Sequence, residues 1–487
     1  MSRDVLDRAR RSRDARFDGK FFIAVTSTRI YCRSICPAKT SKDANVRYYA
    51  TAAEAAAAGF RPCLRCRPET APGSPAWLGT SAVVRRALRL IQDGALDQAS
   101  VDELANRLGV GARHLCRLFA RHVGASPGAV AQTRRLHFAK QLLDETSLPI
   151  TAIALGSGFR SVRRFNDVFK AMYRRPPREI RKAGRKCSVD AEINLRLTYR
   201  PPYDWSRISA FFAREAIPGV ESVGAAVYQR AVPATGGHAV VQVRPIAGVD
   251  ALELCVRGGE SSDLLSLSST VRRVFDLSAD PARIADVLGG DPLLARQINR
   301  CPGLRIPGAW GLFESGVRAI VSRHAGADNA QELLVALVER TGRRLAEAGT
   351  GLTHLFPTPD SVAAATPREI GLPRTCVSKL QSFARALRDR PVTFSGSSDQ
   401  VVPAVAAQLG VDHWSAGYIA LRGLGEPDAL PGGDPLLCRL AAPAATALTT
   451  TELDTRAERW RPFRGYAVLH LWEAGDANIR GPKTAGL

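Results

Sequence analysis

Four cysteines grouped in two close pairs constrain the N-terminal part of the chain more than any other feature. Three residues separate Cys32 from Cys36, and two separate Cys63 from Cys66. This spacing suits a tetrahedral Zn²⁺ ion, because each pair supplies two thiolates from one turn and the intervening loop returns the second pair. The segment that holds them is too short to bury a large core, so a metal cross-link is physically reasonable. We therefore predict one zinc ion bound by Cys32, Cys36, Cys63 and Cys66.

The spacing alone leaves the role of this zinc open. A zinc-bound thiolate is either an inert ligand or a nucleophile that stays ionised at neutral pH. The apolar run at 21–25 and the pair Ile30-Tyr31 read as short strands that deliver Cys32 to a loop. A small α+β module held together by zinc follows from this pattern.

The charge balance indicates a polyanionic partner. The 487 residues include 68 Lys and Arg against 46 Asp and Glu, a net charge of +22. Such an excess favours nucleic acid first and a membrane surface second. No apolar run reaches the ~18 residues that span a bilayer, and the N-terminus has no signal-peptide core, so we expect a cytoplasmic protein without membrane contact. In that reducing compartment lone cysteines are expected to be small buried side chains; these are Cys116, Cys187, Cys255, Cys301, Cys376 and Cys438.

The middle of the chain contains two helix-turn-helix patterns in series. Ser100 precedes an apolar-periodic run and has Glu103 at the third helical position, which is typical of a capping box. A Gly-Val-Gly turn then leads into a second helix at 112–122 that is rich in Arg and His. A similar unit follows at 150–170. Two helix pairs in which the second helix is basic indicate DNA recognition rather than a plain helical bundle.

Composition shifts divide the chain into four segments. Linker-like stretches lie at 70–75 and 181–186, alternating strand patterns follow at 239–243 and 252–256, and the chain is helical beyond Pro281. We predict a multidomain, mainly α protein with α+β parts. The predicted domains are a zinc module at 1–75, an all-α double helix-turn-helix domain at 76–186, an antiparallel β subdomain at 190–280, and a helical domain at 281–487, which the resemblance described below implies to be of the helix-hairpin-helix type.

The cysteine module resembles a known family. The runs Ile30-Tyr-Cys-Arg-Ser-Ile-Cys-Pro37 and Phe60-Arg-Pro-Cys-Leu-Arg-Cys-Arg-Pro68 closely resemble the N-terminal module of Ada-type methylphosphotriester repair proteins. The resemblance implies that Cys32 is both a zinc ligand and the methyl acceptor, and that the other three cysteines are ligands. It also implies DNA-backbone contacts by Thr28, Lys39 and Arg61. Arg29 departs from the family, which usually has glycine there.

The segment from about 81 to 182 resembles the AraC family of DNA-binding domains. The resemblance rests on Pro149-Ile-Thr-Ala-Ile-Ala-Leu-Gly-Ser-Gly-Phe159 and Tyr173-Arg-Arg-Pro-Pro177. It implies that two recognition helices enter neighbouring major grooves. The DNA-contacting residues would be Arg113, His114 and Arg117 in the first helix, and Ser161, Arg163, Arg164 and Asn166 in the second.

The C-terminal part contains a glycine turn that opens into a helix, Leu409-Gly-Val-Asp-His-Trp-Ser-Ala-Gly-Tyr418, followed by Asp434. A turn of this kind can present backbone N–H groups to a phosphate, here around Gly410. Together with 458–472 and 306–310, these residues resemble AlkA-type alkylbase DNA glycosylases of the helix-hairpin-helix superfamily, from about Ile193 onward.

That resemblance implies a role for four side chains. Asp434 would stabilise the oxocarbenium-like sugar as the N-glycosidic bond breaks, and Trp414, Tyr418 and Trp472 would line the pocket for the flipped base. Trp414 occupies the position at which bifunctional relatives carry a lysine nucleophile, so the resemblance implies a monofunctional glycosylase.

Three features depart from the family pattern. Asp412 replaces the second glycine of the hairpin, and Pro435 directly follows Asp434. Where the family often has Gly-Gln, an apolar wedge and Val-Ser, this chain has Ser322-Arg323-His324-Ala325-Gly326. His324 would then have to fill the gap left by the flipped base.

The sequence thus predicts an alkylation-response protein that accepts methyl groups, activates transcription and excises bases of the 3-methyladenine type. The alternative is a methylation-sensing transcription factor whose glycosylase-like domain only binds DNA. Alkylated DNA and promoter DNA are the predicted partners, RNA polymerase is a further one, and the chain is expected to be a monomer. The Cys-His-Arg motif of guanine-O6 repair is absent from the sequence.

Overall fold

The computed structural model describes residues 1–72, 82–181, 192–345, 351–370, 372–389, 398–442 and 446–479. The chain divides into two compact units. The first comprises Met1–Pro201, Ala226–Arg273 and Leu277–Ala279, and the second comprises Pro202–Ala225, Val274–Asp276 and Asp280–Leu487. Cys187 and most of the predicted boundaries at 70–75 and 181–186 lie outside the described residues. Within the described ranges, no helix has the length and apolar character needed to cross a membrane.

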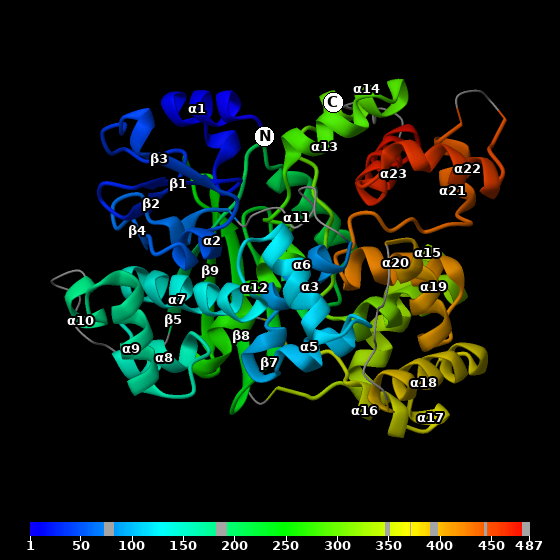
Figure 1. Cartoon of the computed structure of the whole chain (residues 1–487). Coiled ribbons are helices and arrows are strands. Elements are labelled where there is room, and N and C mark those ends of the chain that lie inside the picture. Colours follow the sequence, from blue (N-terminus) through cyan, green and yellow to red (C-terminus); the bar gives the residue numbers. More distant parts are fainter. Residues whose placement is uncertain are drawn as a thin grey trace, which may run out of the picture. The chain divides into compact units, whose positions relative to one another are not determined.

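The first unit begins with a small mixed sheet in the order β3-β1-β2-β4 (Figure 1). Its elements are α1 (Arg3–Ser12), β1 (Phe22–Val25), β2 (Ile30–Cys32), β3 (Val46–Tyr49), α2 (Ala52–Ala57) and β4 (Arg61–Pro62). The short strands predicted around residues 21–25 and 30–31 are present. Phe22 and Tyr31, which meet edge to face with ring centroids 5.8 Å apart, form the centre of its core. This core is small, as expected for a module that needs a metal.

The helical part of the first unit contains both predicted helix-turn-helix patterns. Its helices are α3 (Ala82–Gln92), α4 (Ala95–Gln98), α5 (Val101–Arg107), α6 (Ala112–His122), α7 (Pro127–Glu145), α8 (Ile150–Gly156), α9 (Val162–Tyr173) and α10 (Pro177–Ile180). Ser100 and Glu103 form the predicted capping box of α5. Gly109 adopts φ +65° in the turn before α6, a conformation that glycine reaches without steric cost. Leu104, Leu115 and Phe119 are buried in the shared core.

An antiparallel sheet completes the first unit. Its strands within this unit are β5 (Glu192–Thr198), β7 (Tyr228–Ala234), β8 (Gly237–Pro245) and β9 (Ala251–Gly258), with β9 paired to both β5 and β8, and β8 paired to β7. Helix α12 (Leu264–Val274) follows, and Arg272 Nη1 donates to the carbonyl of Thr198 at 3.2 Å. The strand predictions at 239–243 and 252–256 fall within β8 and β9.

Arginine side chains join the parts of the first unit. Arg200 is 1% exposed. Its guanidinium donates to the carbonyls of Asp18 and Pro72 in the cysteine module and of Ser278 and Ala279 beyond the sheet. Helix α7, which lies beside α2 (Figure 1), contributes a second link. Arg67 directly follows Cys66, and its Nε lies 2.8 Å from Oδ2 of Asp144 in α7.

The second unit is almost entirely helical. Its elements are α11 (Trp205–Glu215), β6 (Glu221–Val223), α13 (Pro281–Leu288), α14 (Pro292–Arg300), α15 (Leu312–Thr341), α16 (Pro359–Ala364), α17 (Pro367–Ile370), α18 (Arg374–Asp389), α19 (Ser398–Leu409), α20 (His413–Tyr418), α21 (Pro435–Leu440), α22 (Thr450–Ala457) and α23 (Arg464–Ile479). A π-helical turn at Ile419–Gly423 extends α20. Such turns occur often at functional sites. The α19–turn–α20 hairpin is the one that the glycine pattern predicted.

Candidate functional sites

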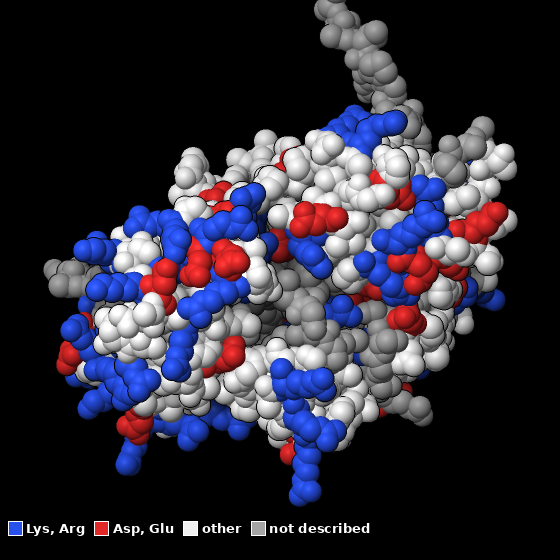
Figure 2. Space-filling view, turned by 45° about the horizontal axis from the view of Figure 1, so that its top comes forward, with Lys and Arg blue, Asp and Glu red and all other residues white. Residues whose placement is uncertain are grey.

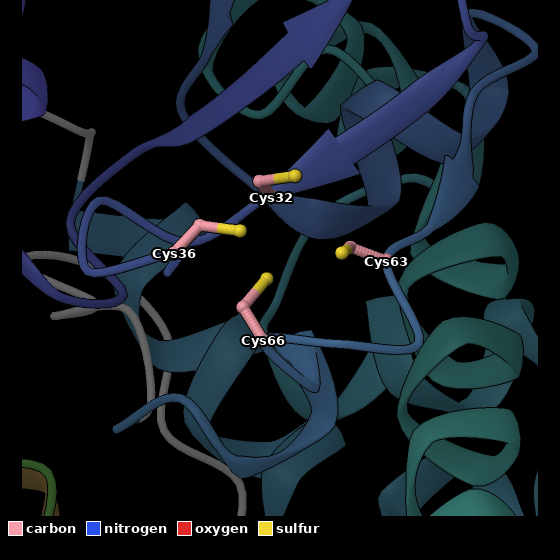
Figure 3. Close-up of side chains that lie close together, drawn as sticks. All are labelled: Cys32, Cys36, Cys63 and Cys66. Atoms are coloured by element: carbon pink, nitrogen blue, oxygen red, sulfur yellow. The ribbon is translucent and has the colours of Figure 1, made fainter. Parts of the chain in front are cut away.

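The four predicted zinc ligands converge in the structure. Cys32 ends β2 and Cys63 follows β4, and these strands run parallel with Ile30 opposite Arg61. Their sulfurs and those of Cys36 and Cys66 all lie within 4.8 Å of one another, and the side chains point toward a common centre (Figure 3). A tetrahedral zinc ion with Zn–S bonds of about 2.3 Å would set the sulfurs about 3.8 Å apart. The four-sulfur donor set and its spacing therefore fit zinc.

The four sulfurs differ in their hydrogen bonds. The Arg33 N–H donates to Cys66 Sγ at 3.4 Å, and backbone groups of Ala38 and Cys66 hydrogen-bond to the sulfurs of Cys36 and Cys63. Within the described residues, no backbone N–H donates to the sulfur of Cys32. The Cys32 thiol instead lies within hydrogen-bonding reach of the other sulfurs, and its contact with Cys36 raises the pKa of Cys32 and lowers the pKa of Cys36 to about 7. Four thiols this close cannot all ionise without a cation between them, and a bound divalent ion would keep all four deprotonated.

A buried ion pair supports the metal centre. The Arg33 side chain, next to Cys32, pairs with the Asp18 carboxylate, with Nε 2.9 Å from Oδ1. Its Nη1 also donates to the carbonyl of Cys66 at 3.3 Å and to Thr70 Oγ at 2.6 Å. This arginine fixes both cysteine-bearing segments and places a positive charge beside the thiolates. Its role could not be predicted from the sequence, because Asp18 lies 15 residues away along the chain.

The predicted DNA-backbone contacts of the cysteine module lie at its surface. Thr28 and Lys39 are exposed, and Arg61 is partly exposed and donates to the carbonyl of Pro62 at 3.3 Å. Arg29 has φ +55°, in the left-handed region that favours glycine over other residues. Its guanidinium lies 5.6 Å from the centroid of the Phe60 ring, a cation–π contact that offsets part of the backbone strain.

The two recognition helices present most of their predicted residues to solvent. Arg113, His114 and Arg117 are exposed on α6, where Arg117 Nη2 lies 2.9 Å from His114 Nδ1. On α9, Arg163 and Arg164 are exposed and Asn166 is half-buried. The Ser161 hydroxyl is the N-cap of α9 and accepts the Arg164 N–H, so its side chain is engaged in capping. Figure 2 shows Lys and Arg spread over much of the visible surface, with smaller groups of Asp and Glu between them.

One lone cysteine contradicts the prediction of burial. Cys116 is exposed on α6, whereas the other single cysteines within the described ranges are buried. The reason is helical periodicity: Leu115 and Phe119 occupy the face of α6 that packs on the core, which leaves Cys116 on the outer face with Arg117.

Asp434 is held by four donors in the second unit. Its Oδ1 caps α21 by accepting the N–H groups of Leu436 and Leu437 at 2.8 and 3.3 Å. Its Oδ2 accepts the indole N–H groups of Trp414 and Trp472 at 3.4 and 3.3 Å. The sequence predicted these three side chains for one site, and the structure brings them together. The four bonds fix the carboxylate in one orientation at the start of a helix, where the helix dipole favours negative charge.

Pro435 fits this arrangement despite being atypical. It is the first residue of α21, where proline loses no hydrogen bond and its fixed φ suits the helix. The substitution is therefore compatible with the cap that Asp434 forms.

An aromatic and cationic cluster lies next to Asp434. The rings of Trp414 and Tyr418 stack with centroids 5.4 Å apart. Arg422 Nη1 donates to the Tyr418 hydroxyl at 2.7 Å, and its guanidinium lies 4.3 Å from the ring centroid of Phe211. Burial raises the pKa of Tyr418, so its hydroxyl stays protonated and can donate to a further acceptor.

The hairpin departs from a simple phosphate-binding turn. Gly410 has φ +64°, as the turn requires. Asp412 caps α20 and accepts the Ser415 N–H at 3.1 Å, so its carboxylate occupies the helix N-terminus. Arg323 lies 4.0 Å from it, whereas the ring of His324 bonds to the Ile320 carbonyl at 2.8 Å on its own helix.

Three family models match consecutive parts of the chain. They are the metal binding domain of Ada at residues 6–69, a helix-turn-helix domain at 104–183, and the AlkA N-terminal domain at 194–311. A "probable bifunctional transcriptional activator/DNA repair enzyme AlkA" of Mycobacterium tuberculosis is 36% identical over 472 residues, which cover 96% of this chain and 95% of the relative. The chain belongs to this AlkA-type bifunctional family.

Other relatives match one part of this AlkA-type chain each. The DNA-3-methyladenine glycosylase 2 of Escherichia coli is 32% identical over 282 residues, 57% of this chain and 95% of the relative. The Ada protein of E. coli is 36% identical over 148 residues, 30% of this chain and 40% of the relative. The solved 3-methyladenine DNA-glycosylase of Archaeoglobus fulgidus superposes with a TM-score of 0.50 at 18% identity, over 59% of this chain and 99% of the other. The predicted family and fold class are confirmed, and the zinc module is of the Ada type.

Sequence reasoning missed two residues of the cluster beside Asp434, Arg422 and Phe211. Arg422 lies four positions after Tyr418, so helical spacing could have placed it on the same face. Phe211 comes from α11, distant along the chain, and no sequence signal connects it with Arg422.

Proposed function

We propose that the chain is an alkylation-damage response protein that accepts methyl groups from DNA methylphosphotriesters on Cys32, activates transcription, and excises alkylated bases. The observation that carries this proposal is the presence, on one chain, of a four-cysteine centre of the Ada type and of a carboxylate, Asp434, held between two indoles. The full-length relationship to a bifunctional activator and repair enzyme supports it.

Cys32 is the reactive sulfur in this proposal. A backbone N–H that donates to a thiolate withdraws electron density from it, and the other three sulfurs accept such bonds. Bound zinc would keep the thiolates ionised at neutral pH. The Cys32 sulfur attacks the methyl carbon of the triester, the C–O bond breaks, and its electron pair remains on the phosphate oxygen. The product is a thioether and a restored phosphodiester, so each chain reacts once.

Methylation changes the charge next to the DNA backbone. A thiolate becomes a neutral thioether, which removes one negative charge and raises affinity for phosphate. The exposed arginines of α6 and α9 then bind promoter DNA. Because one chain carries two recognition helices, a monomer can span two grooves. Activation further implies a contact with RNA polymerase.

Asp434 supplies the electrostatics of base excision. As the N-glycosidic bond breaks, positive charge develops on the sugar, and the fixed carboxylate stabilises it and orients the attacking water. Alkylated purines are cationic, so the rings of Trp414, Tyr418 and Trp472 favour them through cation–π attraction. Trp414 stands where a lysine would form a Schiff base, which supports a monofunctional enzyme of the DNA-3-methyladenine glycosylase II type.

Base release tests the enzymatic part. Wild-type chain should free 3-methyladenine and 7-methylguanine from methylated duplex, and Asp434→Asn should reduce the rate at least about 100-fold, since the charge is lost while Oδ1 can still cap α21. Asp286→Asn, an exposed aspartate of α13, is the matched control. A wild-type chain that binds the duplex and releases no base would favour the alternative, a transcription factor whose glycosylase-like part only grips DNA.

Mass spectrometry tests the acceptor. After incubation with methylphosphotriester DNA, the peptide that contains Cys32 should carry one added methyl group. Cys116→Ser should react like wild type, and Cys32→Ser should not react. A methyl group on another cysteine would overturn the assignment.

A further inference from the structure

A fixed negative charge occupies the hairpin of the second unit. Asp412 Oδ1 accepts the Ser415 N–H at 3.1 Å, and Oδ2 accepts the Ser415 hydroxyl at 2.8 Å. Although burial opposes ionisation, the bonds from Ser415 lower the pKa of Asp412, so the carboxylate is charged at neutral pH. Its side chain is 46% exposed. A phosphate that approached the start of α20 would find the Ser415 N–H occupied and would be repelled by the carboxylate.

Arg323 is the cation that faces this carboxylate. It projects from α15, and its Nε lies 4.0 Å from Asp412 Oδ1. Its guanidinium lies 5.6 Å from the ring centroid of Trp414. The side chain is 50% exposed, and within the described parts of the chain it has no ion-pair partner besides Asp412. An exposed pair at this distance is worth at most about 1 kcal/mol, so the guanidinium remains free to bind a second anion.

His324 does not share this position. Its Nδ1 lies 2.8 Å from the carbonyl of Ile320, one turn back along α15, and the side chain is half-buried. Of these two neighbouring residues, the one that faces the hairpin and the Trp414 ring is therefore Arg323, not His324, which stands at the wedge position.

We propose that Arg323 is the phosphate-contacting anchor of the base-excision unit, in place of the hairpin backbone that Asp412 occupies. The inference rests on the proposed function, because it assumes that this unit acts on duplex DNA. A guanidinium can bridge the carboxylate on one side and a phosphate oxygen on the other, since its donors lie in a planar fork. Arg323 also lies against Trp414, whose N–H holds Asp434. Only the Trp414 side chain therefore separates Arg323 from the Asp434 carboxylate. In this proposal Arg323 positions the DNA and takes no part in the bond cleavage itself.

The test is single-turnover release of 7-methylguanine from duplex DNA by the full chain, as a function of protein and salt concentration. This readout reports base excision even though other parts of the chain also bind DNA. Arg323→Gln should raise the half-saturating concentration about tenfold and leave the maximal rate within about threefold. When the logarithm of the half-saturating concentration is plotted against the logarithm of salt concentration, the slope for Arg323→Gln should be smaller by about 0.9, the value for one phosphate contact. Arg323→Lys should keep most of the salt slope.

Arg340→Gln is the matched control, because it makes the same change at an exposed position on the same helix, about 25 Å away at ~1.5 Å per residue. It should behave like wild type. Asp412→Asn should lower the half-saturating concentration, and Arg323→Gln should still reduce the salt slope in that background.

Three outcomes would overturn the inference. The first is an unchanged salt slope in Arg323→Gln with normal base release by wild type. The second is an effect of Arg323→Gln that disappears in the Asp412→Asn background, which would mean that Arg323 only neutralises Asp412. The third is that His324→Ala, and not Arg323→Gln, raises the half-saturating concentration. A wild type that releases no base would instead remove the proposed function and this inference with it.

Discussion

The hydroxyl of Tyr31 lies 2.8 Å from Nε2 of His137. Tyr31 directly precedes Cys32 and His137 belongs to helix α7, so this contact joins the cysteine module to the DNA-binding part. Tyr31 is fully buried, and burial lowers the pKa of His137 to about 4. The imidazole is therefore neutral in the folded protein at pH 7. With Arg67 and Asp144, this contact fixes the metal module directly on the central helix of the double helix-turn-helix.

The low pKa of His137 predicts acid sensitivity of the first unit. In the unfolded chain a histidine titrates near pH 6.5, and in the folded chain His137 titrates near 4. The unfolded state therefore gains the proton first, and stability falls as pH drops from about 6.5 to about 4. Urea unfolding at pH 7.5, 6.5 and 5.5 with saturating zinc should show a shallower pH dependence for His137→Gln than for wild type. His122→Gln, at the end of α6, should keep the wild-type pH dependence. The prediction would be contradicted if the unfolding free energies of His137→Gln and His122→Gln changed equally with pH.

Zinc removal should destabilise the first unit more than the second. The cysteine module has a small core, and its contacts with α7 and with Arg200 transmit its loss to the rest of the unit. Differential scanning calorimetry should show that a chelator lowers the transition of the first unit by several degrees and leaves the other in place. Cys36→Ser should mimic the chelator, whereas Cys116→Ser should retain zinc. A uniform shift of both transitions would argue against this coupling.

Local sequence patterns predicted local structure well. The cysteine spacing located the metal centre, and Ser100 with Glu103 located a helix start, because both depend on residues that are near neighbours along the chain. The Asp434 site was predicted from a family resemblance, not from spacing. Arg200 and His137 were not predicted, since their partners are set by tertiary packing of segments far apart in the sequence. The exposed Cys116 shows that residue type is a weaker guide to burial than helical phase.

Gly417 should be essential for the placement of Asp434. A Cβ atom there would lie 2.6 Å from the Cα of Pro431, in the segment that leads to Asp434. Gly417→Ala must therefore displace this backbone and with it the carboxylate, and we expect at least about a tenfold loss in the maximal rate of base release. Gly311→Ala, whose Cβ would meet nothing within 4 Å, should retain the rate. An active Gly417→Ala with unchanged melting temperature would show that the loop tolerates the shift.

The two indole N–H groups should each contribute to catalysis through the orientation of Asp434. Trp414→Phe and Trp472→Phe remove one donor to Oδ2 but keep an aromatic ring. A hydrogen bond to a charged group is worth about 1.5 kcal/mol or more, so each change should lower the maximal rate of base release about tenfold. Because both donors act on one oxygen, the double variant should lose less than the product of the two effects. Trp205→Phe, whose N–H donates to the Ala225 carbonyl at 3.2 Å, is the control. Wild-type rates in both single variants would show that the backbone N–H groups of Leu436 and Leu437 suffice to hold the carboxylate.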